Sequence, residues 1–208
     1  MNNNDLLNLA DQIAQSAGQE ILAVYNKTGN IDVTVKDDNS PLTEADQRAH
    51  KVIVAGLSEA VPDIPILSEE SEQLEFSVRS TWDRYWLVDP LDGTKEFIKR
   101  NGEFTVNIAL IEHGQPVLGV VHVPVTGVTY RGECGVGASK TENGTDSAIQ
   151  CRRIAPGQKA LKVVASRSHR APELDDLLER MRKQFSDLEL VSMGSSLKIC
   201  LVASGEAD

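Results

Sequence analysis

Two helices are predicted in the N-terminal part of the chain. Over residues 5–27, apolar side chains recur every three or four positions with polar side chains between them, which is the spacing of an amphipathic helix. A second helix is predicted to begin after Thr43 and to end near Ala60, because Thr43-Glu44-Ala45-Asp46 has the form of a capping box. The apolar positions of the first helix are Leu6, Leu9, Ile13, Ala17, Ile21 and Val24.

Short apolar runs bounded by turn residues predict strands over much of the remaining chain. Residues 104–111 and 116–123 are separated by Glu112-His113-Gly114-Gln115, which predicts a hairpin. The glycine-rich residues 132–144 are expected to form a hairpin loop. The predicted strands are residues 31–35, 66–67, 85–88, 104–111, 116–123, 127–131, 161–165 and 188–191, and two later helices are residues 172–184 and 195–203.

The order of the elements changes after Ala155-Pro156-Gly157. Before this point, helices flank a set of mainly antiparallel strands, and after it strands and helices alternate. We therefore expect a mixed fold, with an N-terminal α+β domain over residues 1–155 and the start of an α/β domain over residues 156–208.

The composition narrows the class of protein. The 208 residues include 31 acidic and 21 basic side chains, a formal net charge of −10, which disfavours binding to nucleic-acid polymers. Three widely spaced cysteines without a CxxC pair argue against a disulfide framework or a thiolate zinc site. No run approaches the roughly 20 apolar residues of a membrane span, and the N-terminus lacks a signal-peptide pattern. We expect a cytoplasmic protein with no integral membrane segment; the pattern leaves open its oligomeric state and a peripheral association with the inner membrane face.

Acidic residues that follow two short apolar strands are the sharpest chemical feature of the sequence. Glu69 follows the strand at residues 66–67, and Asp89 and Asp92 follow the strand at residues 85–88. Three carboxylates converging at strand ends would repel one another unless a cation neutralised them, and all-oxygen surroundings suit Mg²⁺. Taken alone, the same residues also fit an ordinary turn and an ordinary surface loop.

Gly93 and Thr94 add a place for an anion next to this predicted cation site. Glycine permits a tight backbone path at residue 93. If a helix begins at Thr94, its free backbone N–H groups and its dipole point toward the same place as the carboxylates. A metal ion beside phosphate-binding amides is the arrangement that phosphate-ester hydrolysis needs.

Several motifs together resemble the inositol monophosphatase superfamily. The most specific is Trp-Leu-Val-Asp-Pro-Leu-Asp-Gly-Thr at residues 86–94, which looks like the first signature of that superfamily. Its continuation, Lys95-Glu96-Phe97, is similar to the CysQ branch, the 3'(2'),5'-bisphosphate nucleotidases, rather than to the Thr-Asn-Phe of inositol monophosphatases. The other matching segments are residues 40–46, 68–70, 84–85, 166–169 and 194–198.

The resemblance implies a fold, a reaction and a cofactor. The fold is the layered αβαβα sugar-phosphatase fold. The reaction is the Mg²⁺-dependent removal of the 3'-phosphate from 3'-phosphoadenosine 5'-phosphate, a step linked to sulfur assimilation, which yields AMP and phosphate. Its phosphosulfate analogue is a second candidate substrate, and lithium inhibition is expected. The implied partner is thus a small phosphorylated nucleotide.

The resemblance also assigns roles to residues of this chain. Glu69 and Asp89 would hold a first Mg²⁺ with the carbonyl of Leu91, and Asp89 and Asp92 would reach a second. Glu69 and Thr94 would position the attacking water, and Asp46 would lie behind Thr94 or near a weaker third ion. The implied substrate-binding residues are Glu69, Leu91, Asp92, Gly93, Thr94, Ser166, His169, Ser195 and Lys198.

Two alternatives to the nucleotidase remain open at this point. One is a phosphatase acting on inositol phosphates or other sugar phosphates. The other is a binding module for metal or phosphate without activity, because the chain reaches Asp208 before the superfamily's second signature, Trp-Asp followed by small residues. On that basis the sequence resembles a CysQ protein without its C-terminal portion, and weakened metal binding and activity are expected of these 208 residues.

Overall fold

The computed structural model describes residues 1–28, 33–35, 41–72, 74–167 and 172–208. The chain forms two compact units, Met1–Ala148 and Ile149–Asp208. The boundary proposed from the sequence, at residue 155, lies a few residues further along the chain. Each unit is described by itself below.

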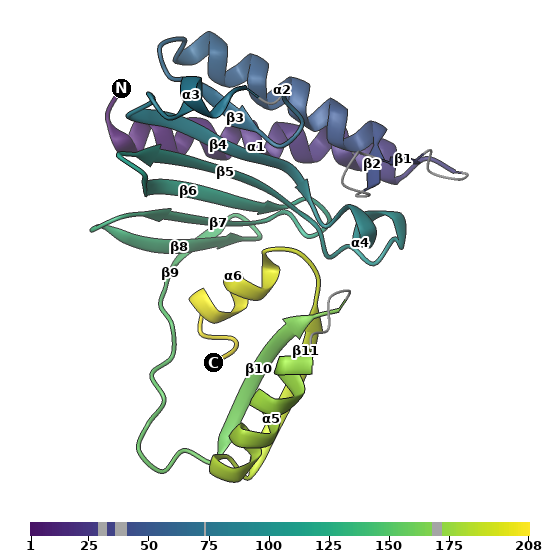
Figure 1. Cartoon of the computed structure of the whole chain (residues 1–208), viewed down its shortest axis with the longest axis vertical. Helices are drawn as coiled ribbons and strands as arrows, with labels where there is room; N and C mark the ends of the chain where they lie inside the picture. The colour runs from purple at the N-terminus through teal and green to yellow at the C-terminus, as the bar shows by residue number, and fades with distance from the viewer. Residues whose placement is uncertain (29–32, 36–40, 73, 168–171) are drawn as a thin grey trace. The chain divides into compact units, whose positions relative to one another are not determined.

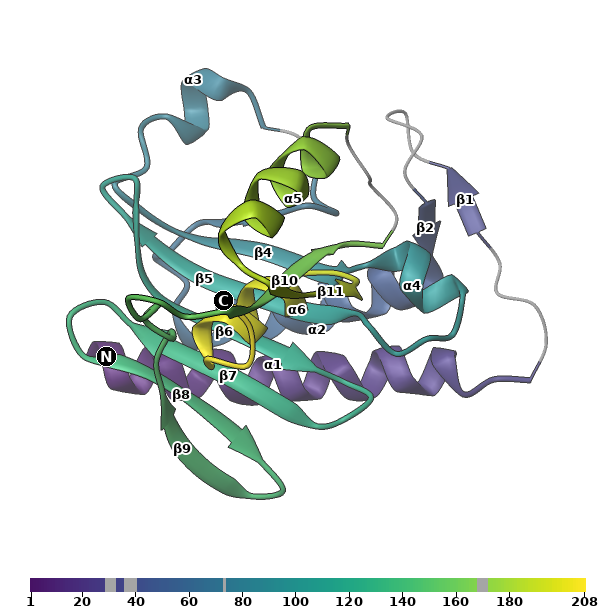
Figure 2. The same cartoon turned by 90° about the horizontal axis from the view of Figure 1, so that it is seen from below.

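Two long helices, α1 (Asn3–Tyr25) and α2 (Glu44–Ala60), lie side by side in the first unit, as Figures 1 and 2 show. Both begin with a capping box: Asn2 with Asp5 for α1, and the predicted pair Thr43 with Asp46 for α2. The apolar stripe predicted for α1 is buried apart from Leu9, which is partly buried, so the periodicity identified the correct face.

A seven-stranded sheet forms the other layer of this unit, in the order β3-β4-β5-β6-β7-β8-β9. Strands β3 and β4 are parallel, and the pairs from β4 to β8 are antiparallel, which agrees with the mainly antiparallel prediction. The predicted hairpin joins β5 to β6. The strands are β3 (Ile66–Ser68), β4 (Arg84–Asp92), β5 (Thr105–Glu112), β6 (Gln115–Val123), β7 (Val128–Glu133), β8 (Gly137–Glu142) and β9 (Thr145–Ile149).

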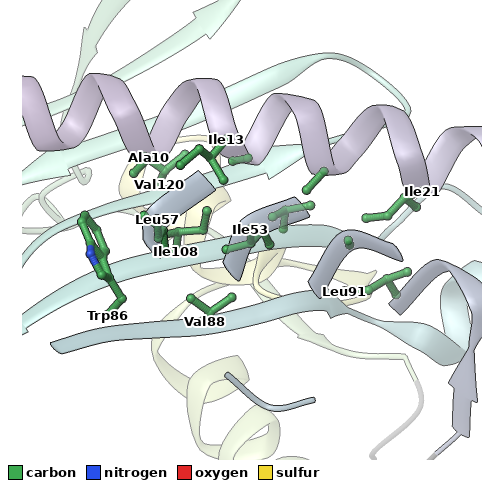
Figure 3. Packing of buried hydrophobic residues seen from close by; sticks show 14 of the residues in the cluster. Ala10, Ile13, Ile21, Ile53, Leu57, Trp86, Val88, Leu91, Ile108 and Val120 are labelled. Atoms are coloured by element: carbon green, nitrogen blue, oxygen red, sulfur yellow. The ribbon is translucent and has the colours of Figure 1, made fainter. Parts of the chain in front are cut away.

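The hydrophobic core of the first unit lies between the helix pair and the sheet. Figure 3 shows Ile13 and Ile53 of the two helices facing Val88, Ile108 and Val120 of the strands. Trp86 is fully buried in the same cluster, and β4 packs against α2. This packing fixes the strand that carries the conspicuous acidic motif.

Short elements complete the first unit. Two helices of one turn, α3 (Phe76–Arg79) and α4 (Thr94–Ile98), stand before and after β4. A small antiparallel pair, β1 (Val33–Val35) and β2 (Pro41–Thr43), leads into α2. The predicted strand over residues 31–35 is therefore present in the part that is described.

Two parallel strands and two helices form the described part of the second unit. Strands β10 (Ala160–Ser166) and β11 (Asp187–Met193) pair in parallel, with α5 (Pro172–Gln184) between them in the chain and α6 (Leu197–Ala203) after them. This is the strand–helix alternation predicted after residue 155.

Two local predictions were wrong. Residues 132–144 are not one loop, because Gly137–Glu142 forms strand β8, which pairs with β7 after a short turn at residues 134–136. Strand β4 does not end at Val88 but continues to Asp92, because Asp89 and Asp92 pair with residues of β5. The acidic motif therefore lies within the end of a strand rather than after it.

Candidate active site

Glu69 and Asp89 are brought together by the parallel pairing of β3 and β4. Ser68 lies opposite Val88 in this pairing, and the Glu69 N–H extends the ladder by donating to the Val88 carbonyl at 3.0 Å. The next residue of each strand is an acid. Because parallel strands run in the same direction, both carboxylates emerge at the same edge of the sheet.

A bulge in β4 brings Asp92 to the same side as Asp89. Asp89 lies opposite Asn107, and Asp92 lies opposite Thr105. Between these two pairs, β4 therefore contains one residue more than β5. In a regular strand, residues three apart face opposite sides; the extra residue restores the same side. The Asn107 side-chain amide also donates to Asp92 Oδ2 at 3.4 Å.

The electrostatics of Asp89 reflect this convergence. Burial, the nearby carboxylates of Glu69 and Asp92 and a hydrogen bond with Glu69 raise the pKa of Asp89 to about 8, although the Leu91 N–H donates to Asp89 Oδ1 at 3.2 Å and opposes this shift. A hydrogen bond between two carboxyl groups requires that one of them hold a proton. At neutral pH and without a cation, the three carboxyl groups at this edge are therefore not all ionised, because Asp89 keeps its proton.

Thr94 is held beside the carboxylates by Asp46 of α2. The Thr94 hydroxyl donates to Asp46 Oδ1 at 3.1 Å, and its oxygen lies 3.4 Å from the Leu91 carbonyl oxygen. The other Asp46 oxygen accepts from the Thr43 N–H at 2.8 Å and from the Thr43 hydroxyl at 2.5 Å. Asp46 is only 1% exposed, and burial raises its pKa. Both of its oxygens are engaged within the protein, so this geometry places Asp46 behind Thr94.

Gly93 turns the chain from β4 into α4. Its φ of 97° and ψ of 40° are left-handed, a conformation that glycine adopts without strain. Helix α4 begins at Thr94, and its first hydrogen bonds are donated by Glu96 and Phe97 to the Gly93 carbonyl. The N–H groups of Gly93 and Thr94 precede those bonds and are thus outside the helical ladder.

These donors fit a hard divalent cation. Glu69, Asp89 and Asp92 offer carboxylate oxygens and Leu91 offers a carbonyl oxygen, which is the ligand set that Mg²⁺ prefers. The raised pKa of Asp89 is the observation that supports the fit, because a cation here would replace the proton that the cluster otherwise retains. In the described ranges, no group of three or more His, Cys, Asp or Glu side chains has the arrangement of a metal site.

A cavity of about 640 Å³ lies next to the carboxylates, over strands β3 to β6 of the first unit. Glu69, Asp89 and Asn107 line its polar part, and Leu67 and Leu87 are among its apolar residues. A volume in this range accommodates a small organic ligand.

The second unit contains the remaining residues that were predicted to bind substrate. Ser166 ends β10, and His169 lies outside the described residues. Helix α6 begins at Leu197 after its N-cap residue Ser196, and the Leu197 N–H donates to Ser195 Oγ at 3.3 Å. The Lys198 ammonium donates to the carbonyl oxygens of Met193 at 3.4 Å and Ser195 at 2.5 Å. Substrate contact by these residues stays a prediction.

Sequence reasoning missed two polar residues at this edge, His50 and Asn107. The Nδ1 atom of His50 lies 2.9 Å from the Ser68 hydroxyl, beside Glu69. Its position four residues after Asp46, on the same face of a helix, was the available signal. Asn107 had no such signal, because its place opposite Asp89 depends on the pairing of two strands.

Comparisons with known proteins identify the family of the chain. Residues 2–208 match the inositol monophosphatase family. The chain belongs to that family. It is 52% identical over 202 residues to the 3'(2'),5'-bisphosphate nucleotidase CysQ of Shigella flexneri, a match that covers 97% of this chain and 78% of the relative.

Solved structures support the same assignment of fold. The crystal structure of CysQ from Bacteroides thetaiotaomicron has a TM-score of 0.83 and 42% identity, covering 98% of this chain and 78% of that one. An inositol monophosphatase from Thermotoga maritima has a TM-score of 0.79 and 27% identity, over 98% of this chain and 74% of that one. These matches confirm the family resemblance and the mixed, layered fold class. Among the described helices, none has the length and apolar character needed to cross a bilayer.

Proposed function

We propose that this protein is a Mg²⁺-dependent 3'(2'),5'-bisphosphate nucleotidase that converts 3'-phosphoadenosine 5'-phosphate and water to AMP and phosphate. The observation that carries the proposal is the cluster of Glu69, Asp89 and Asp92, in which the pKa of Asp89 rises to about 8, beside Thr94 at the start of α4. The 52% identity to a CysQ nucleotidase supports the nucleotide substrate over others of the family.

Glu69, Asp89, Asp92 and the Leu91 carbonyl would hold Mg²⁺, two ions in the expected case. Bound Mg²⁺ supplies Lewis acidity toward the phosphoryl oxygens and lowers the pKa of water. Asp46 orients the Thr94 hydroxyl by accepting its hydrogen at 3.1 Å, so the lone pairs of Thr94 Oγ1 are left to accept a hydrogen from the attacking water. Glu69 is the neighbouring carboxylate that can take the proton of that water.

The backbone at the start of α4 would bind the phosphate that is transferred. The N–H groups of Gly93 and Thr94 are outside the helical ladder, and the left-handed turn at Gly93 directs the chain into the helix. Water attacks phosphorus, the bond from phosphorus to the ribose 3'-oxygen breaks, and that oxygen leaves with a proton. No covalent intermediate with the protein is required.

Phosphate release by the purified chain tests this proposal. With Mg²⁺, 3'-phosphoadenosine 5'-phosphate should be hydrolysed in preference to inositol 1-phosphate, activity should disappear with EDTA, and Li⁺ should inhibit it. The phosphosulfate analogue belongs in the same assay as a second candidate substrate. Preference for inositol 1-phosphate would favour a sugar phosphatase, and Mg²⁺-dependent nucleotide binding without hydrolysis would favour a binding module.

Asp89→Asn and Asp63→Asn form a matched pair for the same assay. Asp63 is an exposed acid in the turn between α2 and β3, so its replacement removes one carboxyl group, as Asp89→Asn does, without touching the carboxylate cluster. Loss of hydrolysis in Asp89→Asn and its retention in Asp63→Asn is the expected result.

A further inference from the structure

Helix α2 presents two polar side chains, one turn apart, to two different segments at the carboxylate edge. Asp46 Oδ1 accepts a hydrogen bond from the Thr94 hydroxyl at 3.1 Å, as described above. His50, four residues later, has its Nδ1 atom 2.9 Å from the Ser68 hydroxyl. Residues four apart on a helix lie on the same face, so a single rigid element contacts both segments.

The Ser68 contact fixes the backbone from which Glu69 projects. Ser68 is 4% exposed, and its carbonyl accepts a hydrogen bond from the Ser71 N–H at 3.1 Å, which closes the turn after β3. The Glu69 N–H is bound to the Val88 carbonyl on the other side. These two bonds close the turn at residues 68–71, here called the Glu69 turn, and connect it to β4. The contact between His50 and Ser68 connects the same turn to α2.

We propose that His50 is a positioning residue, which holds the Glu69 turn at a set distance from Thr94 by anchoring Ser68 to the helix that also carries Asp46. His50 acts through Ser68 and is not a ligand of the ion or of the substrate. The geometric need is plain: Glu69 and Thr94 come from elements separated by more than twenty residues, yet the proposed chemistry requires both to direct the same water. The metal and activity consequences rest on the proposed function, whereas the effect on the Glu69 turn does not.

Hydrogen exchange in metal-free protein tests the anchor itself. In His50→Ala, the amides of Glu69 and Ser71 should exchange about fivefold faster or more, the effect of losing one hydrogen bond on local opening. Ser68→Ala should have the same effect, and the double variant should be no faster than the faster single variant, because both changes remove the same bond. His50→Asn, whose amide can reach the place of Nδ1, should restore most of the protection.

Calorimetry with Mg²⁺ and steady-state kinetics test the consequence. Loss of an outer support of a metal ligand weakens metal binding by about tenfold, so His50→Ala should weaken Mg²⁺ binding by about tenfold. It should also lower kcat while leaving the nucleotide KM nearly unchanged, and His50→Asn should recover both.

The chain contains a matched control for this pair. His122 Nδ1 lies 2.8 Å from the Thr129 hydroxyl in the same unit, which is the same kind of bond in a place remote from Glu69 in the sheet. Thr129→Val should lower thermal stability without changing Mg²⁺ affinity or the exchange of Glu69.

Two results would overturn the proposal. One is unchanged exchange at Glu69 in His50→Ala; the other is an equal loss of Mg²⁺ affinity in Thr129→Val, which would assign the effect to general stability. If exchange responds as expected but the wild-type chain hydrolyses no nucleotide, the anchor stands and the proposed function fails.

Discussion

Asp89→Asn should stabilise the metal-free protein while abolishing hydrolysis. Folding raises the pKa of Asp89 from 3.8 to about 8. At pH 7 the unfolded chain therefore carries an ionised Asp89, whereas the folded chain retains the proton. That difference of about three pH units, at about 1.4 kcal/mol each, corresponds to on the order of 4 kcal/mol of lost stability. Asparagine has the same shape and no charge, so the variant escapes most of this cost.

Urea unfolding in EDTA between pH 4 and pH 9 measures this effect. Because the folded state binds the proton more tightly, Asp89 lowers stability progressively as the pH rises from about 4 to about 8. The stability gained by Asp89→Asn should thus be small at pH 4, grow with pH, and level off near pH 8. Asp63→Asn, the change of an exposed acid, should show no such growth.

Adding Mg²⁺ should reverse the order of stability. The wild-type cluster gains binding energy in the folded state, and the variant lacks one of the proposed ligands. A gain that does not depend on pH, or a variant less stable than wild type in EDTA at pH 7, would refute the reasoning about mutual repulsion at this edge of the sheet.

Three further predictions concern other parts of the first unit. Thr94→Val should lower kcat by about 10²-fold or more with little change in KM, because Asp46 would have no hydroxyl to orient; near-normal kcat in a phosphate-release assay would contradict this role. Burial lowers the pKa of His122 below 6.5 in the folded protein. As the pH drops below about 6.5, His122 is therefore protonated more readily in the unfolded chain than in the folded one, and the free energy of unfolding should fall. Urea titrations should show a smaller drop in His122→Gln, and an equal drop would exclude His122 as its source. Phe97→Ala should cost about 3–5 kcal/mol of unfolding free energy, because this fully buried ring of α4 packs 5.3 Å from the rings of Tyr25 and Phe104; a loss below about 1 kcal/mol would show that the site can collapse.

Local features of this chain could be predicted from sequence because they depend on neighbours in the sequence. The periodicity of residues 5–27 located α1 and its buried face, and the four residues from Thr43 to Asp46 located the start of α2. The turn at Glu112–Gln115 located a hairpin. In each case propensity, capping and apolar spacing agree with the final packing.

Features that depend on distant pairing could not be predicted in the same way. Strand β4 continues through Asp89 to Asp92 only because β5 pairs with it, and the bulge that turns both acids to one side is a property of the two strands together. Strand β8 has a weak local signal and forms by pairing with β7. The partnership of His50 with Ser68 requires the packing of α2 beside β3, so it became visible only in the fold.

The candidate site also combines features that depend on neighbours in the sequence with features that depend on tertiary contacts. The acids and the Gly93–Thr94 step were identified from their order in the chain, because the motif is contiguous apart from Glu69 and Asp46. The role of Asp46 came from the family resemblance, and its hydrogen bond to Thr94 is a tertiary contact. The sequence alone contained no means of ranking Asp46 above other acids of α2, such as Glu44, which is exposed and pairs with Lys27 and Arg48.

Calorimetric titration of Mg²⁺ at pH 7 in two buffers of different ionisation enthalpy tests the central claim most directly. If Glu69, Asp89 and Asp92 gather around the ion, its binding must expel the proton that the raised pKa keeps on Asp89. We predict binding with the release of nearly one proton for each protein molecule at pH 7, falling toward zero by pH 9, and neither binding of this strength nor release in Asp89→Asn. Mg²⁺ binding that releases no proton at pH 7, or that persists unchanged in Asp89→Asn, would contradict the account.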